Sequence, residues 1–380
     1  MSLNIFDDKP VTPCLLLDVD RMTRNIQDLE ARLARLGVPI RPHVKTCKSI
    51  EIARPMMASN SPGITVSTLA EAEYFFDHGI EDQLYAVGVA PGKLDRIAEL
   101  YRNGLALKLT VDNSGAARSL AEAAARLDCA LWVVLEIDAD GRRGGFRPDE
   151  PDMLEAAETV TKAGGRVLGV MTHMGASYDC RDAECLERAA EQERLAVVNA
   201  AHRLRRAGFE LQIVSVGSTP TAAFARNLEG VSEVRAGTHV FMDLVMAGLG
   251  VCAVDDIAIS VLTEVIGARP DAGEWLVDAG WMALSRDRGT ASQAVDQGYG
   301  IVCSENGTVI DNIIVRATSQ EHGILARRDG KAIEPGRFEI GQRLRILPNH
   351  ACATAAQHDG YWLVGEDLDA GRFWPRMRGW

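Results

Sequence analysis

Residues 14–237 alternate between short apolar runs and segments whose apolar residues recur at helical spacing. Nine runs rich in Val, Ile and Leu are typical of strands, and they span residues 14–19, 40–45, 63–67, 83–87, 105–111, 131–137, 167–173, 211–217 and 234–237. Helical patterns fill most of the gaps, for example at 21–36, 69–78, 114–127 and 183–206. Strands that alternate with helices predict a parallel sheet with right-handed crossovers.

Nine candidate strands are one more than an eight-stranded β/α barrel contains. The run at 14–19 is the best candidate for the extra strand, and we expect it to join another domain. An open, doubly wound sheet is the competing fold. The GxGxxG fingerprint of its dinucleotide-binding members does not follow the first strand. The pattern therefore predicts an α/β chain in which residues 10–255 form a (β/α)8 barrel.

The pattern changes after about residue 255, where helical periodicity fades and Gly, Asp and Pro separate short β-rich runs. These runs span residues 261–266, 275–277, 298–303, 308–317 and 343–347. They predict a second, mainly antiparallel β domain over residues 256–380, with residues 1–19 packing with it. The basic and aromatic end, residues 372–380, is expected to be a packed tail.

Composition narrows the function classes. The chain has 380 residues, 47% of them hydrophobic, and a formal net charge of −12. That acidity argues against nucleic acid or an anionic membrane as a partner. We see no signal peptide and no apolar run near the roughly 20 residues that a membrane helix needs. The eight cysteines are scattered, and Cys180 and Cys185 lack CxxC spacing. We therefore expect a reduced, cytoplasmic protein rather than a zinc or redox pair.

Lys45 is the most informative candidate, because it ends the predicted strand 40–45 in the motif Arg-Pro-His-Val-Lys-Thr. Active sites of β/α barrels lie at the carboxyl ends of their strands. A lysine held there, partly out of water, has a lowered pKa and can form a Schiff base. These features point to pyridoxal phosphate as a cofactor held by Lys45. An isolated lysine at a strand end would more often simply reach solvent.

Two loops after late strands have the composition of a phosphate site. Ser218 and Thr219 follow the run 211–217 and open onto a helical stretch, where backbone N–H groups and hydroxyls can meet an anion. A simple helix N-cap is the alternative interpretation. Gly237 and Thr238 end the next strand, and the two loops together predict a phosphate cup.

Three more stretches carry candidate chemistry. In residues 136–145 a strand ends in acids followed by two arginines, one of which we expect to hydrogen bond the cofactor ring. A solvated turn is the alternative there. His173 ends the run 167–173, and with Tyr178 it is a candidate cofactor contact. His173 is also a candidate catalytic residue, although a core or capping histidine is the alternative.

His350 and Cys352 are the candidate metal ligands. Alternate residues of a strand point to the same face, so the two side chains would project together. A neutral imidazole and a thiolate suit Zn²⁺ best, and two protein ligands leave positions for water and substrate. A half-buried strand with a packed cysteine is the alternative.

Eight motifs together resemble the D-threonine aldolase and D-serine dehydratase family, and they cover nearly the whole chain: RPHVKT, GITVSTLAEAE, EIDADGRRGG, VSVGSTPT, EVRAGTHVFMD, DAGWMALSRDRG, QEHGILAR and ILPNHACAT. The resemblance implies fold type III pyridoxal phosphate architecture: an alanine-racemase-like barrel plus a β domain, in a homodimer. It implies Lys45 as the Schiff-base lysine and Arg143 as the partner of the pyridine nitrogen. The residues that it implies around the phosphate and on a divalent metal (Zn, Mn or Mg) are Ser218, Thr219, Gly237, Thr238, His350 and Cys352.

The resemblance also implies an activity, the dehydration of D-3-hydroxy amino acids such as D-threo-3-hydroxyaspartate or D-serine to a 2-oxo acid and ammonia. Aldolase members carry His-x-Asp where this chain has His350-x-Cys352, which favours dehydration over the alternative, a D-threonine aldolase. His239 departs from the family, which often has tyrosine there. Arg286 and Arg288 are the candidate cations for a substrate β-carboxylate.

Two other classes of protein stay open. An amino-acid racemase would need a second base from the second domain, and Tyr299 and Tyr361 are available. A carrier that binds pyridoxal phosphate without turnover would be a single barrel, so residues 256–380 argue against it.

Overall fold

The computed structural model describes residues 10–105, 107–127, 131–365 and 372–380. Residue 106 of the predicted strand 105–111, Cys129 and the N-terminal segment searched for a signal peptide lie outside these residues. These described residues divide into two compact units: the barrel unit, which takes those within 27–237 and 379–380, and the β unit, which takes those within 10–26 and 238–378. The division between Gly237 and Thr238 lies earlier than the change in sequence pattern near residue 255. Among the described residues, no helix has both the length and the apolar character needed to cross a membrane.

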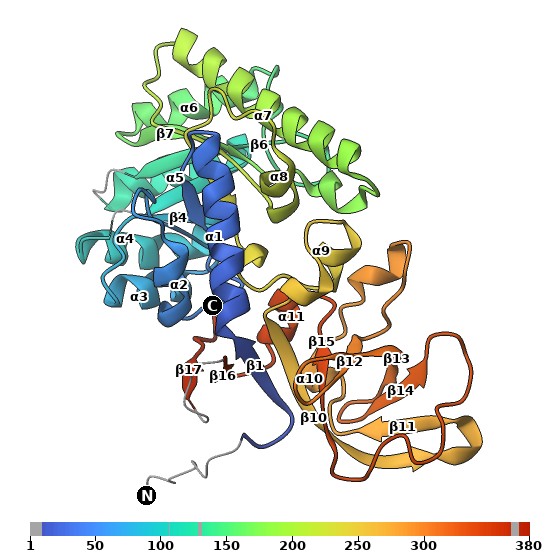
Figure 1. Cartoon of the computed structure of the whole chain (residues 1–380). Helices are drawn as coiled ribbons and strands as arrows, with labels where there is room; N and C mark the ends of the chain where they lie inside the picture. The colour runs from blue at the N-terminus through green and yellow to red at the C-terminus, as the bar shows by residue number, and fades with distance from the viewer. Residues whose placement is uncertain (1–9, 106, 128–130, 366–371) are drawn as a thin grey trace, which may run out of the picture. The chain divides into compact units, whose positions relative to one another are not determined.

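The barrel unit contains eight parallel strands in one sheet, of which Figure 1 labels β4, β6 and β7. In spatial order they are β2 (Ile40–Pro42), β9 (Glu233–Ala236), β8 (Ile213–Val216), β7 (Arg166–Thr172), β6 (Trp132–Ile137), β5 (Lys108–Val111), β4 (Gln83–Gly88) and β3 (Ile64–Val66). A parallel bridge between His43 and Thr65 joins the two ends of this series. The predicted barrel is confirmed, and an open doubly wound sheet is excluded.

Helices connect the strands, and amphipathic patterns explain them. The helices are α1 (Val19–Arg35), α2 (Ile50–Met56), α3 (Leu69–Asp77), α4 (Leu94–Arg102), α5 (Ser114–Leu127), α6 (Asp152–Lys162), α7 (Ala183–Arg206) and α8 (Thr219–Phe224). The longest, α7, buries Leu186, Val197 and Leu204 on one face. The Asp182 side chain caps its first turn by accepting the Cys185 N–H.

An ion network centred on the buried Arg41 lies in the amino-terminal half of the barrel. The Arg41 guanidinium lies 2.9 Å from the Glu233 carboxylate and 2.5 Å from Asp82. Lys108 lies 2.8 Å from the second oxygen of Asp82. Arg41 is one of the most buried side chains of the protein, so its charge requires these partners. The network joins β2, β5 and β9 at the end that serves stability, and leaves the carboxyl ends of the strands for chemistry.

The β unit has one nine-stranded sheet. Its order is β11 (Glu274–Val277), β14 (Gly323–Arg327), β13 (Val309–Thr318), β12 (Ile301–Ser304), β15 (Arg343–Leu347), β10 (Ile259–Arg269), β1 (Cys14–Asp18), β16 (Gly360–Val364) and β17 (Phe373–Pro375). An additional pairing of β10 with β11 folds the sheet into a barrel-like form. The predicted antiparallel domain is confirmed, and so is the expectation that the run at 14–19 joins it.

Within this unit, β1 pairs antiparallel with β10 and parallel with β16. The sequence pattern did not identify β14, β16 and β17. The last of these is part of the tail that was expected to pack, and the Phe373 ring lies 5.2 Å from the Trp362 ring. Short strands of this kind acquire their conformation from their neighbours, since three to five residues carry little periodicity of their own.

Candidate active site

Lys45 lies in a turn at the carboxyl end of β2. The strand ends at Pro42, three residues before its predicted end, and a turn over residues 44–47 follows, closed by the Lys48 N–H donating to the Val44 carbonyl (2.8 Å). Val44 and Thr46 are buried, whereas the Lys45 side chain is exposed. Lys45 is therefore more exposed than expected, although its charge still acts on the buried imidazoles of His43 and His173.

His43, directly before this turn, was not identified from the sequence as a site residue. Its Nε2 lies 3.4 Å from the Ser67 hydroxyl. Its buried Nδ1 has no hydrogen-bond partner among the described residues. Burial lowers the pKa of His43 well below its usual value, helped by the nearby charges of Lys45 and Arg235. His43 is thus a neutral imidazole two residues from the candidate cofactor lysine.

Two glycines allow backbones to approach closely beside this turn. A Cβ on Gly217 would lie 1.9 Å from the Arg235 carbonyl oxygen, and its φ of +139° also favours glycine. A Cβ on Gly237 would lie 2.6 Å from the His43 carbonyl oxygen and 3.0 Å from Thr46 Oγ1. The loop after β9 therefore packs directly on the turn that carries Lys45.

Ser218 and Thr219 begin α8 and are nearly fully buried. The Ser218 hydroxyl accepts the Thr221 N–H (3.2 Å), and the Ser218 N–H donates to the Thr221 hydroxyl (3.1 Å). The N-cap interpretation of this loop is thus realised. Ser218 Oγ also lies 3.4 Å from the hydroxyl of Ser177, which brings a second strand-to-helix connection to the same place.

His173 connects these elements. Its Nδ1 lies 3.0 Å from the Gly217 carbonyl oxygen, to which it must donate. Its buried Nε2 has no hydrogen-bond partner among the described residues. Burial, assisted by the positive charge of Arg143, lowers the pKa of His173 to about 4. The ring is therefore neutral at pH 7 and presents an unprotonated Nε2.

The remaining candidates of the barrel unit lie around His173. The Tyr178 ring is 6.4 Å from the His173 ring and belongs to η2 (Gly175–Asp179). Arg143 is exposed in the loop after β6, and its charge influences both His173 and Glu136. The neighbouring Arg142 forms an ion pair with Asp179.

Glu136 is a further residue of this end of the barrel. Burial raises its pKa to about 7, although Arg235 and Arg143 oppose the shift. Strongly shifted pKa values cluster at functional sites. An acid near the carboxyl end of a barrel strand was the sequence signal for this residue.

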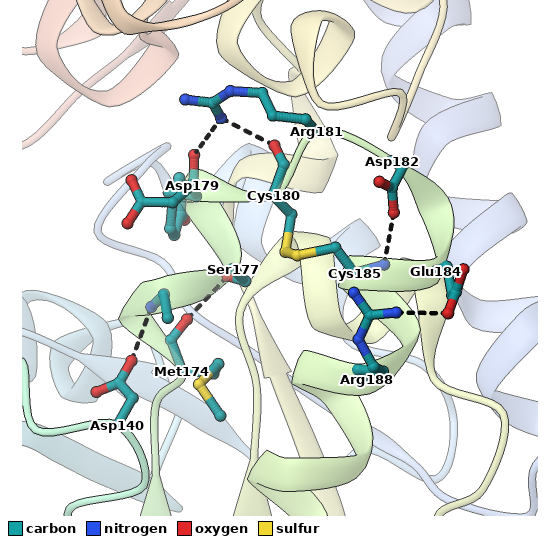
Figure 2. Close-up of a disulfide and its surroundings, with 12 residues drawn as sticks. Asp140, Met174, Ser177, Asp179, Cys180, Arg181, Asp182, Glu184, Cys185 and Arg188 are labelled. Atoms are coloured by element: carbon teal, nitrogen blue, oxygen red, sulfur yellow. Dashed lines mark hydrogen bonds and ion pairs between the residues drawn. A yellow bond between two sulfur atoms is a disulfide. The ribbon is translucent and has the colours of Figure 1, made fainter.

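Cys180 and Cys185 are joined by a disulfide, with their Cα atoms 5.5 Å apart (Figure 2). The expectation that these cysteines stay reduced is not met. The spacing of the cysteines in the sequence did not predict the bond. The two residues are brought together by the fold, through η2 and the first turn of α7. The disulfide therefore ties the segment that carries Ser177 and Tyr178 to α7.

The β unit holds the candidate metal ligands. The prediction that one strand carries both residues is wrong, because β15 ends at Leu347. His350 is the N-cap of α11 (Ala351–Ala355), and Cys352 lies in the first turn of that helix. The two side chains nevertheless form a hydrogen bond. His350 Nδ1 lies 2.7 Å from Asp287 Oδ2, a residue not identified from the sequence.

These contacts govern the ionisation of His350. Burial alone would lower its pKa, but the hydrogen bonds with Asp287 and Cys352 raise the pKa to about 11. The Cys352 sulfur also lies 3.9 Å from the Thr238 hydroxyl. The described residues contain no cluster of three or more His, Cys, Asp or Glu side chains that could hold a metal.

His239, which replaces the tyrosine common in the resembling family, is buried in the β unit. Burial lowers its pKa to about 3, so the imidazole is neutral.

Comparison with known proteins identifies the family to which this chain belongs. Residues 17–245 match the alanine racemase N-terminal domain and residues 258–364 match a putative serine dehydratase domain. The D-threo-3-hydroxyaspartate dehydratase of Delftia sp. is 50% identical over 97% of this chain and 98% of its own length. Its solved structure has a TM-score of 0.95 and 49% identity over 98% of both chains.

Two further relatives frame the range of activities. The D-serine dehydratase of Dictyostelium discoideum is 31% identical over 94% of both chains. The solved D-threonine aldolase of Filomicrobium marinum has a TM-score of 0.80 and 27% identity, covering 96% of this chain and 95% of its own. The chain therefore belongs to the alanine racemase-like family of enzymes that contains these D-hydroxy amino acid dehydratases and aldolases.

Proposed function

We propose that this enzyme is a pyridoxal phosphate- and divalent metal-dependent dehydratase. It converts a D-3-hydroxy amino acid, D-threo-3-hydroxyaspartate foremost, into a 2-oxo acid and ammonia. The observation that carries the proposal is the meeting of the His350 imidazole with the Cys352 thiol in the β unit. The likeness to the Delftia dehydratase along nearly the whole chain supports the substrate class.

The residues of the barrel unit fit pyridoxal phosphate. Lys45 offers an exposed primary amine at the carboxyl end of a barrel strand. The buried Nε2 of His173 has a lone pair and no partner among the described residues. Gly217 and Gly237 lie where any larger residue would clash with backbone. We assign Lys45 as the attachment point, Arg143 to the ring nitrogen, and Tyr178 and His173 to contacts with the ring. The proposed phosphate ligands are Ser218, Thr219 and Gly237 of the barrel unit, together with Thr238, the next residue of the chain and the first of this part of the β unit.

When bound, pyridoxal phosphate supplies an electron-withdrawing ring that stabilises negative charge at the substrate α-carbon. Lys45 Nζ, as a free amine, removes the α-proton. His173 stays neutral and oriented, because its Nδ1–H is committed to the Gly217 carbonyl. Arg143 would hold the ring nitrogen in its unprotonated form, since a guanidinium only donates hydrogen bonds.

The residues of the β unit fit a divalent metal of borderline softness. An imidazole and a thiolate are the ligands that such ions prefer, and two protein ligands leave positions for water and substrate. When bound, the metal supplies a Lewis acid for the departing β-hydroxyl. A dehydratase variant in which a cysteine is replaced by alanine has been solved in a metal-free form, which is consistent with a cysteine ligand.

A D-threonine aldolase is the second candidate function, since the aldolase of Filomicrobium marinum shares the fold over 96% of this chain. Such an enzyme would break the Cα–Cβ bond and release glycine and an aldehyde. The Cys352 thiol in place of the aspartate of aldolase members favours dehydration.

Two substitutions test the assignment of cofactor and metal. Lys45→Ala should abolish the absorbance change that accompanies covalent attachment of pyridoxal phosphate, and with it substrate turnover. Cys352→Ala should leave that attachment intact but remove metal binding and activity together. A Lys45→Ala variant with wild-type turnover would exclude the proposed role of Lys45. A chelator response unchanged in Cys352→Ala would exclude the proposed metal site.

A further inference from the structure

The loop between α10 (Trp281–Leu284) and η6 (Gly289–Ser292) is held against the segment that carries the candidate metal ligands. We name residues 285–288 the 285–288 loop. Three hydrogen bonds hold it and its two ends to that segment: Thr354 Oγ1 to the Leu284 carbonyl (2.9 Å), His350 Nδ1 to Asp287 Oδ2 (2.7 Å) and Thr290 Oγ1 to Asn349 Oδ1 (2.5 Å). Thr354, Thr290 and Asn349 are nearly fully buried. The loop is therefore fixed on both sides of Asp287.

The 285–288 loop also has a fixed conformation of its own. Ser285 has a φ of +72°, a region that costs a residue other than glycine about 1 kcal/mol or more. Its hydroxyl accepts the Asp287 N–H (3.2 Å). The Asp287 carboxylate accepts the backbone N–H of Gly289 in addition to the imidazole N–H. These contacts set the direction of the carboxylate before any ligand binds.

An imidazole has two nitrogens, and Asp287 engages one of them. Because Nδ1 is directed at Asp287, Nε2 is the nitrogen left for Cys352, with which His350 also hydrogen bonds. Ligand histidines usually donate their second N–H to a carboxylate, which fixes tautomer and ring orientation and raises ligand basicity. We propose that Asp287 is a positioning residue of the metal site, which holds His350 so that Nε2 and the Cys352 sulfur face one divalent metal ion. This inference rests on the metal dependence proposed above.

The other acid close to His350 has a different task. Asp243, fully buried, caps α9 (Leu244–Gly248) by accepting the Met246 N–H (2.9 Å). Its second oxygen accepts the Ala351 N–H (2.9 Å), which fixes the backbone next to His350. Asp243 thus positions the helix that carries Cys352, whereas Asp287 positions the imidazole ring.

The test is metal binding rather than turnover. The full-length protein with pyridoxal phosphate bound is titrated with Co²⁺, and the thiolate-to-cobalt charge-transfer absorbance is followed. Asp287→Ala should weaken Co²⁺ binding by about 10- to 100-fold, the usual effect of losing such a partner. Asp287→Asn should lose less, because its amide oxygen can still accept the Nδ1–H. Cys352→Ala should lose the charge-transfer band altogether.

Asp296→Ala is the matched control. Asp296 pairs with Arg288 at 2.5 Å, so the variant also removes a carboxylate held to the 285–288 loop but does not touch His350. It should bind Co²⁺ with wild-type affinity. Wild-type affinity in Asp287→Ala, or equal losses in the Asp287→Ala and Asp296→Ala variants, would overturn the role of Asp287. A wild-type protein that binds no Co²⁺ would instead contradict the metal site itself, and this proposal with it. If the alanine variant fails to fold, Asp287→Asn decides the test, because a neutral amide should still weaken Co²⁺ binding relative to Asp296→Ala, and an affinity equal to that of this control would overturn the role of Asp287.

Discussion

At the scale of single residues, burial sets the ionisation of the groups at the carboxyl end of the barrel. The imidazoles of His43 and His173 have lowered pKa values, whereas burial raises the pKa of the Glu136 carboxyl to about 7. All three groups are thereby shifted towards their neutral forms.

Glu136 should give the protein a measurable dependence of stability on pH. Its pKa is about 7 in the folded protein and 4.5 in the unfolded chain, so the folded state binds more protons between these values. The contribution of Glu136 is therefore complete below about pH 4.5 and is lost as the pH rises to 7. The loss amounts to roughly 3 kcal/mol of unfolding free energy.

Urea unfolding of the cofactor-free protein and of its Glu136→Gln variant, at about pH 5 and pH 8, measures the contribution of Glu136 to the free energy of unfolding. The stability of the variant relative to the wild type should increase as the pH rises, because glutamine does not titrate. Two proteins whose unfolding free energies change in parallel would show that Glu136 has an ordinary pKa.

Arg286 and Arg288 differ in their contacts, although both were candidates for a substrate β-carboxylate. Arg288 pairs with Asp296 at 2.5 Å and lies over the Tyr299 ring. Arg286 stacks 4.1 Å above the Trp281 ring and has no ion pair among the described residues. Arg286, directly before Asp287, is the guanidinium available to an incoming carboxylate.

Arg286→Ala should therefore raise KM for D-threo-3-hydroxyaspartate about 10- to 100-fold, as expected for a lost charged hydrogen bond. It should change KM for D-serine little, since D-serine has no β-carboxylate. Arg288→Ala is the matched control. Equal effects of Arg286→Ala on both substrates would mean that this residue does not select the β-carboxylate.

At the scale of elements, periodicity located most strands and helices but not every local conformation. The predicted helices at 114–127 and 183–206 coincide with α5 and α7, because long amphipathic patterns are unambiguous. His350 and Cys352 were placed on a strand, whereas Pro348 follows β15 and Asn349 turns the chain into α11. Asp287 lies 63 residues from His350, and such contacts leave no trace in local pattern.

The disulfide between Cys180 and Cys185 also belongs to this scale. It closes a loop with a sequence separation of 5 and should contribute about 2 kcal/mol to the free energy of unfolding. Dithiothreitol should therefore lower the unfolding free energy of the wild type to that of a Cys180→Ser, Cys185→Ser double variant. The double variant itself should not respond. Cys252→Ser, which removes a free cysteine, is the control. A wild type insensitive to dithiothreitol would show that the bond does not form in solution.

At the scale of the whole molecule, the two-part organisation followed from the change of pattern along the chain. Strand count and periodicity predicted the barrel and the antiparallel second unit. They also predicted that the first strand belongs to the second unit rather than to the barrel. The sequence pattern did not predict the boundary at Gly237. Residues 238–255 form short helices and turns, whose pattern is compatible with either unit. The homodimer implied by the family resemblance stays a prediction.

The identity of the products tests the central claim most directly. The protein, loaded with pyridoxal phosphate and Mn²⁺ or Zn²⁺, is incubated with D-threo-3-hydroxyaspartate, D-serine and D-threonine, and ammonia and glycine are measured separately. A dehydratase should release ammonia with an equal amount of 2-oxo acid and no glycine, with D-threo-3-hydroxyaspartate used best. Glycine with an equal amount of aldehyde, such as acetaldehyde from D-threonine, would contradict the account and identify an aldolase.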